Sequence, residues 1–317
     1  MIRKIESSFD LYVCEKIEVI EFILAVISNY KFESLVLNDL TLDINEAIIM
    51  ETINKNDLFS IKLIRSIEDV SISFYYNYER LFSTNYSSDN YNADTVLFII
   101  KCFSKYLKGG WVEESKFSGW NMSLEPSFWE YKKRPIFNPL PVIPLPSPLY
   151  PDYKQYSKEH IPNHTHRMNI NEQLTFTAAW QMYFGKVYYK FIPKPLFDDF
   201  KDCEENVILA YGVRRITLYK NPDDFLQPEN IRRMWSFRRQ LGIDSIAHEL
   251  TFDKNRIEPE NLPVLITKQN CAKGQTKVTR FLDKNYQLIN SDKAVYKEIK
   301  EYLDDGITVV YEEKVNL

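Results

Sequence analysis

Seven of the chain's fifteen prolines fall within RPIFNPLPVIPLPSPLYP, positions 134–151. Proline has no amide hydrogen and fixes the backbone angle φ, so neither a helix nor a central β-strand can run through this segment. We expect an extended, polyproline-like stretch. Such a stretch can be the ligand of a proline-recognition module. Its aliphatic residues Val142, Ile143, Leu145 and Leu149 favour burial, and therefore an internal strap or connector.

This segment sets the expected domain boundaries. Residues 1–133 are expected to form an N-terminal domain, residues 134–169 an extended connector and residues 170–317 a C-terminal domain. A chain of 317 residues is long enough for two domains with a hydrophobic core each. The 44% hydrophobic and 26% charged residues are typical of a globular protein.

Local patterns in the first half alternate between strand and helix. FDLYV (9–13) and VSISFYYNY (70–78) are rich in aromatic and β-branched residues and predict strands. Apolar residues at helical spacing predict a helix over 14–30. ADTVLFIIKCFSKYLKGG (93–110) also predicts a helix, with Gly109 at its end.

The second half has a similar mixture of elements. The predicted strands are 207–220, 263–269, 275–283, 286–290 and 307–315, and the predicted helices are 228–242 and 291–306. These patterns indicate an α+β protein with mixed or antiparallel sheets and flanking helices. We expect two α+β subdomains joined by the proline-rich segment.

Charge and composition exclude several classes of function. The net charge is −4, which argues against non-specific nucleic-acid binding because that needs a basic surface. The chain has only 8 glycines and no phosphate-binding loop, and no cofactor is expected. Its longest apolar run, FILAVI, is too short to cross a membrane, and the first residues do not resemble a signal peptide. We expect a cytoplasmic protein that binds no membrane.

The first 108 residues are acidic, with 16 Asp and Glu against 11 Lys and Arg. An acidic surface suits a basic protein partner, because complementary charge raises the association rate. We therefore name Asp39, Asp43 and Glu46 as candidate partner-binding residues. Solubility alone is the alternative explanation of this charge.

The segment GGWVEESKFSGW, positions 109–120, is bounded by glycines and predicts a loop. It contains Trp111 and Trp120, and exposed tryptophans are frequent anchors in protein interfaces. We name both as candidate partner-binding residues. The alternative is that they fill the seam between two domains.

Three of the four histidines lie in HIPNHTHR, positions 160–167. His160, His164 and His166 raise the question of a metal site, and of a metal-dependent hydrolase. A structural zinc site needs four nitrogen or sulfur ligands, and no cysteine lies nearby. His248 does not begin an HExxH motif either. We therefore expect no metal.

Arg238 falls on the apolar side of the predicted helix 228–242. A buried guanidinium needs a carboxylate partner, because an unpaired buried charge is very costly. Asp244 and Glu249 follow closely, so we expect a structural ion pair between Arg238 and these carboxylates. An active-site arginine is the functional alternative.

Two stretches of the second half, 215–251 and 274–289, resemble immunity proteins encoded beside toxins in bacterial polymorphic-toxin and type VI secretion loci. The family catalogued as immunity protein 52 is the nearest that we can name. That family is thought to be α+β and to pair with toxins of restriction-endonuclease fold. The resemblance carries no catalytic motif onto numbered residues of this chain.

The resemblance implies a protein of bacterial competition that binds and neutralises a cognate toxin, a nuclease effector, in the cytoplasm. Such a protein is not an enzyme. One alternative is a metal-dependent hydrolase, or an enzyme that reverses a toxin's modification, using the His160, His164 and His166 cluster. Another is an effector adaptor of a secretion system. The sequence leaves the oligomeric state open.

Overall fold

The computed structural model describes residues 5–11, 16–29, 32–37, 40–56, 59–65, 70–76, 82–88, 100–101, 107–114, 168–170, 174–176, 178–250 and 261–317. The proline-rich segment 134–151 lies outside these residues, so the expected strap stays a prediction. No helix in the described ranges is both long and apolar enough to cross a membrane.

The chain divides into two compact units that are interleaved in sequence. Unit 1 comprises residues 1–118, 180–185 and 207–215, and unit 2 comprises the remaining segments, 119–179, 186–206 and 216–317. Neither unit is one continuous stretch of chain. Two short segments that follow the expected connector contribute to unit 1.

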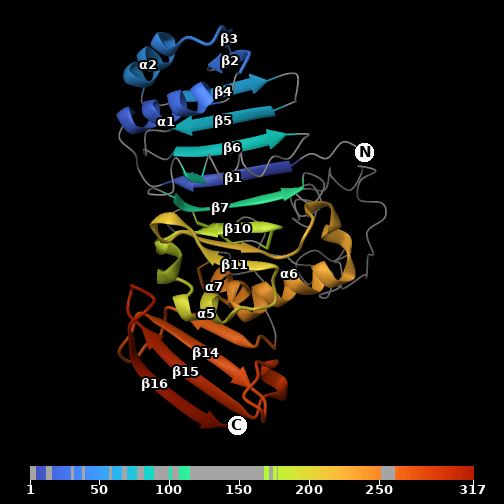
Figure 1. The fold of residues 1–317 in the computed structure, drawn as a ribbon. Coiled ribbons are helices and arrows are strands. Elements are labelled where there is room, and N and C mark those ends of the chain that lie inside the picture. Colours follow the sequence, from blue (N-terminus) through green and yellow to red (C-terminus); the bar gives the residue numbers. More distant parts are fainter. Residues whose placement is uncertain are drawn as a thin grey trace, which may run out of the picture. The chain divides into compact units, whose positions relative to one another are not determined.

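A ten-stranded sheet has eight strands wholly in unit 1, and its strands follow the order β11-β12-β10-β7-β1-β6-β5-β4-β2-β3 (Figure 1). The bounds of unit 1 include only part of β11 and part of β12. The strands are β1 (Ile5–Leu11), β2 (Ser34–Leu37), β3 (Leu40–Leu42), β4 (Phe59–Arg65), β5 (Val70–Tyr76), β6 (Phe82–Ser88), β7 (Leu107–Glu114), β10 (Gln181–Phe184), β11 (Glu205–Ile208) and β12 (Arg214–Thr217). Two helices, α1 (Lys16–Asn29) and α2 (Glu46–Lys55), pack against each other in this unit.

A glycine in β7 allows two aromatic rings to meet inside unit 1. Gly110 lies between Phe9 of β1 and Tyr183 of β10, because it is the register partner of both. Since Gly110 has no side chain, the two rings approach each other across β7 and pack edge to face, with centroids 5.5 Å apart. Both aromatic residues are buried.

Two of the elements predicted for unit 1 are present in the structure, and one predicted helix end is not. The helix expected over 14–30 is confirmed as α1, and the strand expected over 70–78 is confirmed as β5. The predicted end of a helix at Gly109 is wrong, because Gly109 lies in the interior of β7. There its neighbours on both sides are strands, β1 and β10.

Unit 2 contains a four-stranded antiparallel sheet in the order β13-β14-β15-β16. Its strands are β13 (Val264–Thr267), β14 (Thr276–Leu282), β15 (Tyr296–Tyr302) and β16 (Val309–Asn316). The helices of this unit are α5 (Lys194–Asp199), α6 (Pro228–Gln240) and α7 (Ile243–Leu250), and α7 contacts β13. A two-stranded ladder of β8 (Met168–Ile170) and β9 (Leu174–Phe176) also belongs to it, as do the 3₁₀ helices η4 (Lys186–Lys190), η6 (Pro222–Leu226) and η7 (Ser291–Lys293).

The core of unit 2 is rich in aromatic side chains. Phe176 packs edge to face on Tyr188, with ring centroids 5.6 Å apart. Phe200 of the segment after α5 packs in the same way on Phe237 of α6, at 5.3 Å. The second contact joins α6 to the segment after α5, and the helix expected over 228–242 is confirmed as α6. The α+β class, with antiparallel strands and flanking helices, is confirmed as well.

Two predicted strands of the second half are shorter than expected. The stretch 207–220 is interrupted by the 3₁₀ helix η5 (Ala210–Gly212), where Tyr211 and Gly212 have positive φ. The stretch 286–290 contributes one isolated bridge, between Leu282 and Leu288. The strand expected over 307–315 is confirmed as β16.

The helix predicted over 291–306 is wrong, because this stretch contains η7 and the strand β15. Its charged residues lie at spacings that also suit a helix, but here they pair across strands. Lys300 contacts Glu312 of β16 at 3.1 Å, and Glu298 contacts Arg280 of β14 at 3.6 Å. β15 has a strand on each side, and this pairing outweighs the local helical pattern.

Glu301 of β15 is a buried carboxylate, only 2% exposed, that backbone amides hold in place. The amides of Ala272, Lys273 and Gly274 donate to its two oxygens at 2.7–2.8 Å. Burial alone raises the pKa of Glu301, but the three hydrogen bonds outweigh burial and lower this pKa. The carboxylate therefore fixes the turn before β14 to the centre of the sheet.

Replacing Glu301 with Gln should lower the free energy of unfolding by about 1–3 kcal/mol at neutral pH, because an amide NH₂ then faces backbone donors. The folded pKa is lowered, so this contribution is present above the unfolded pKa of about 4.3 and is lost as the pH falls through the folded pKa. Urea unfolding should show that the difference in the free energy of unfolding between wild type and the Glu301→Gln variant is smaller at about pH 3 than at pH 7.

The exposed carboxylate Asp292 provides the matched control. Asp292→Asn should leave the free energy of unfolding unchanged within about 0.5 kcal/mol at both pH values. A Glu301→Gln protein as stable as wild type at neutral pH would contradict the role assigned to the carboxylate.

Candidate partner-binding site

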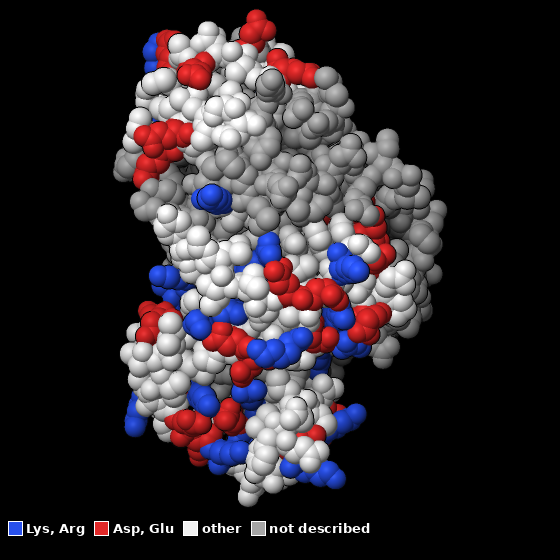
Figure 2. All heavy atoms as spheres, viewed as in Figure 1, with Lys and Arg blue, Asp and Glu red and all other residues white. Residues whose placement is uncertain are grey.

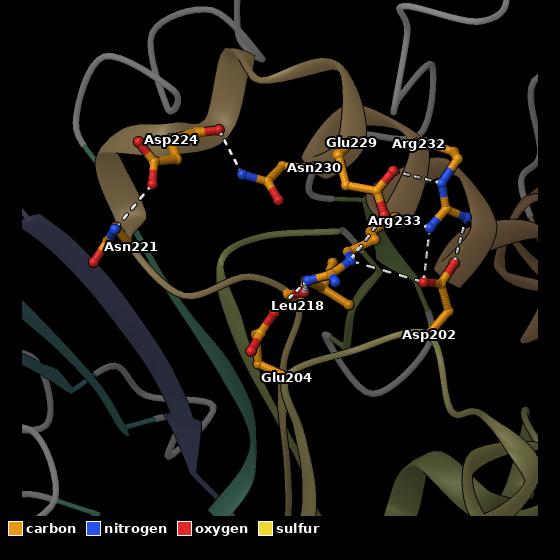
Figure 3. A network of polar contacts seen from close by, with 9 residues as sticks. All are labelled: Asp202, Glu204, Leu218, Asn221, Asp224, Glu229, Asn230, Arg232 and Arg233. Carbon is orange, nitrogen blue, oxygen red and sulfur yellow. Dashed lines mark hydrogen bonds and ion pairs between the residues drawn. The ribbon is translucent and has the colours of Figure 1, made fainter.

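The most extensive polar network of unit 2 that can be described lies along the first turns of α6 (Figure 3). α6 begins at Pro228, whose fixed φ suits the first position of a helix. Glu229 stands in the first turn, and Arg232 and Arg233 follow at helical spacing.

Arg232 is held by two carboxylates. Its Nη1 and Nη2 atoms donate to the two oxygens of Asp202 at 2.7 and 2.9 Å. Its Nε and Nη2 atoms also donate to Glu229, at 3.0 and 2.7 Å. The paired geometry matches the planar guanidinium, and it fixes an arginine whose side chain is still 53% exposed.

Arg233 lies deeper, with 23% of its side chain exposed. Its Nη1 atom donates to Glu204 at 2.5 Å and to the backbone oxygen of Leu218 at 3.2 Å. Its Nε atom lies 3.4 Å from Glu229. The two adjacent arginines therefore connect α6 to the 202–204 segment and to the segment that follows β12.

The turn before α6 is fixed by asparagine side chains. Asn221 donates to the carboxylate of Asp224 at 2.9 Å, and Asn230 of α6 donates to the backbone oxygen of Asp224 at 2.7 Å. These bonds lie beside the arginine network in Figure 3. They hold the start of the helix against η6.

The electrostatics of the network favour the charged forms of Asp202, Glu229, Arg232 and Arg233. Burial tends to raise the pKa of Asp202, but hydrogen bonds from Arg232 and Ser236 lower this pKa on balance. The hydrogen bond from Arg232 lowers the pKa of Glu229, and the carboxylates raise the pKa of both arginines. Asp202, Glu229 and the two arginines are therefore ionised at neutral pH.

This arrangement suits binding. It holds carboxylates and guanidinium groups in fixed positions, and Arg232 and Glu229 remain more than half exposed. On the face drawn in Figure 2, acidic and basic side chains alternate over the described part of unit 2. A protein partner with complementary charges could pair with such a surface.

Of the acidic residues named as partner-binding candidates, two can be placed. Asp43 and Glu46 are exposed, and they flank Asn45, the N-cap of α2, whose side chain accepts from Ala47 and Ile48. The cap fixes the chain where these two carboxylates stand. Asp39 lies outside the described residues.

The loop predicted over 109–120 is wrong for residues 109–114, which belong to β7. Trp111 is 7% exposed and offers almost no surface to a partner. The pairing of β7 with β1 and β10 explains this burial. Trp120 lies outside the described residues. Binding of a partner by either tryptophan stays a prediction.

The histidine cluster also lies outside the described residues, so neither its geometry nor the expected absence of a metal is tested. Within the described ranges, no group of three or more His, Cys, Asp and Glu residues could hold a metal ion.

The expected burial of Arg238 is confirmed, since it is only 1% exposed on α6. Glu249 of α7 accepts from the hydroxyl of Thr267 at 2.9 Å and from the amide of Lys268 at 3.0 Å. It therefore joins α7 to the end of β13. The side chain of Asp244 lies outside the description, and the ion pair with Arg238 stays a prediction.

A cleft of about 240 Å³ lies elsewhere in unit 2 and was not foreseen from the sequence. It is lined by Leu196, Asp199, Phe200, Gln240, Arg280, Tyr286, Gln287 and Leu288. Tyr286 has a φ of +62°, an unusual value for a bulky residue. Its ring stacks on Tyr296 at 5.0 Å, beneath the ammonium group of Lys314.

Comparisons with known proteins return little. No protein family and no curated protein matches this chain. A crystal structure of the toxic C-terminal tip of CdiA from Pseudomonas aeruginosa in complex with immune protein is similar over 35% of this chain and 86% of that chain. The identity is 7% and the TM-score is 0.24.

The two adjacent arginines allow a test of the network. Replacing Arg232 with Ala should lower the free energy of unfolding by less than about 1 kcal/mol, because solvent screens an exposed ion pair. Replacing Arg233 with Ala should cost more, about 1–2 kcal/mol, because the backbone oxygen of the buried Leu218 loses its donor and a largely buried side chain loses its packing. Both changes replace arginine with alanine on one helix, so each is the control for the other in urea unfolding. Equal losses of unfolding free energy in the two variants would contradict the larger contribution to stability that we assign to Arg233.

Proposed function

We propose that this chain is an immunity protein that binds and neutralises a cognate bacterial toxin. The observation that carries the proposal is the network of Arg232, Asp202 and Glu229, because it presents fixed charges to solvent. Two of its members, Glu229 and Arg232, belong to the stretch 215–251 on which the resemblance to immunity proteins rests. The proposal also covers the mode of action, which is binding without catalysis.

A fixed arginine favours tight binding. A free arginine side chain loses conformational entropy when a partner immobilises it, and Arg232 has already lost most of that freedom to Asp202 and Glu229. Arginines with an exposed face are frequent anchors in protein interfaces. Arg232 is therefore the residue of unit 2 that we expect a toxin to contact.

The acidic residues at the start of α2 suggest what kind of toxin is bound. A nuclease must present basic groups to bind a phosphate backbone. Asp43 and Glu46 are exposed carboxylates that can pair with such groups, and complementary fields accelerate association. A nuclease effector therefore suits this surface better than a toxin with an acidic binding face.

The first experiment is co-expression of the full chain with the product of the adjacent upstream gene in a sensitive bacterial strain, followed by purification. Survival together with a stoichiometric complex supports the proposal. A complex without survival favours an effector adaptor, which would bind without inhibiting. Survival without a complex contradicts neutralisation by binding and favours an enzyme.

Reversing two acidic charges tests the docking surface. The Asp43→Lys, Glu46→Lys double variant should associate with the purified toxin about tenfold more slowly at low salt, because electrostatic attraction is lost. Wild type should slow as salt is added, and the double variant should slow much less. Stopped-flow association at several salt concentrations measures both effects.

The matched control changes the same number of charges elsewhere. Asp292→Lys, Asp304→Lys replaces two exposed carboxylates of unit 2 that lie away from α2 in the sequence and should associate as wild type does. If both double variants are slowed equally, net charge and not this surface governs the rate.

A further inference from the structure

β16 forms one edge of the four-stranded sheet of unit 2 (Figure 1). It pairs with β15 on one side, and among the described residues no strand pairs with its other side. An unpaired edge of this length offers a row of backbone donors and acceptors to another strand.

The hydrogen bonds at both ends of β15 show which residues of β16 face outward. Leu317 donates to Val295, and Leu303 donates to Thr308, so odd-numbered residues of β15 face β16. The register places Ile299 opposite Glu313, and backbone groups alternate along a strand. The amides and carbonyls of Glu312, Lys314 and Asn316 therefore point away from β15.

These outward groups restrict how a second β16 could pair antiparallel to the first. Outward-facing residues must oppose one another, so even-numbered positions must pair with even-numbered positions. Val310 is bulged out of the ladder with β15, so this alternation holds from Tyr311 onward. In that part of the strand, the register centred on Glu313 places each Glu312 opposite Lys314 of the second copy. A shift of two positions in either sense places Glu312 opposite Glu312, or Lys314 opposite Lys314. Each of these three registers has one like-charge pair on its axis, but only the register centred on Glu313 adds two opposite-charge pairs, Glu312 with Lys314.

We propose that β16 is a self-association site, and that two copies of this chain pair through antiparallel β16 strands in the register centred on Glu313. Each Glu312 then stands between Lys300 of its own chain, at 3.1 Å, and Lys314 of the second copy. The same register sets Tyr311 opposite Val315. The occupant of this edge is thus a second copy, selected by the charge sequence of the strand itself.

Apolar residues around the ends of β16 fit the same arrangement. Ile307, Val309 and Leu317 are each more than 40% exposed. Antiparallel pairing brings the end of one strand beside the beginning of the other, so Leu317 comes near Val309 of the second copy. Dimer formation removes apolar surface from water at both ends of the interface.

One contact in the proposed dimer is unfavourable. Glu313 faces its own copy at the two-fold axis, in a pair whose side chains are close. Its carboxylate accepts a hydrogen bond from the hydroxyl of Tyr311 at 2.8 Å, but two like charges still face each other. A short interface of this kind gives a weak dimer, and we expect a dissociation constant on the order of 100 μM.

Sedimentation velocity on the full chain over a wide concentration range tests the proposal. The apparent molecular mass of the wild-type protein should rise with concentration from 37.7 kDa, the mass of one chain, towards twice that value. Glu312→Pro should weaken dimerisation at least about tenfold, because it removes an outward amide from both copies. Proline is tolerated on an edge strand where the amide faces solvent, so pairing with β15 is retained.

Two further variants make the test specific. Glu312→Ala removes the same carboxylate but keeps the amide, so it should dimerise better than Glu312→Pro. Glu313→Gln removes the repulsion at the axis and should strengthen the dimer. A wild type that remains monomeric at the highest concentration, or a Glu312→Pro protein that dimerises as wild type does, would overturn the proposal. Neither result bears on toxin neutralisation, which is scored by survival.

Discussion

Backbone hydrogen bonding of two central strands is the constraint on which the described structure depends. β7 has β1 and β10 beside it, and β15 has β14 and β16 beside it. A strand in such a position must pair its amides and carbonyls on both edges, because a buried unpaired group is costly. Both strands were misread from the sequence, which shows that long-range pairing and not local preference determines them.

The secondary structure was predicted correctly where it depends on residues close together in the sequence. α1 and α6 follow the helical spacing of their apolar residues, and β5 follows its β-branched and aromatic composition. β15 carries lysines and glutamates at spacings that suit a helix, and only the adjoining strands reveal them as cross-strand pairs. The glycine at position 110 leaves room for two aromatic rings in the strand interior. These rings could not be identified from the sequence, because Phe9 lies 101 residues before Gly110 and Tyr183 lies 73 residues after it.

The candidate site was predictable to the same extent. Helical spacing correctly placed Arg238 on the buried side of α6. The partners of Arg232 and Arg233 were not foreseen, because Asp202 and Glu204 precede these arginines by 30 and 29 residues, outside any local pattern. The three backbone hydrogen bonds to Glu301 were not predicted for a related reason. The sequence placed Glu301 on a helix, where its carboxylate would not be expected to accept from the amides of residues 272–274.

The interleaving of the two units affects how the chain can fold during its synthesis. β7 ends at Glu114, but its partner β10 does not begin until Gln181, 67 residues later. At about 5–20 residues per second, the ribosome needs roughly 3–13 seconds to synthesise that stretch. During this interval the edge of β7 that β10 later occupies is open to other strands, so the nascent chain has a period of exposure to misassembly that the finished protein does not share.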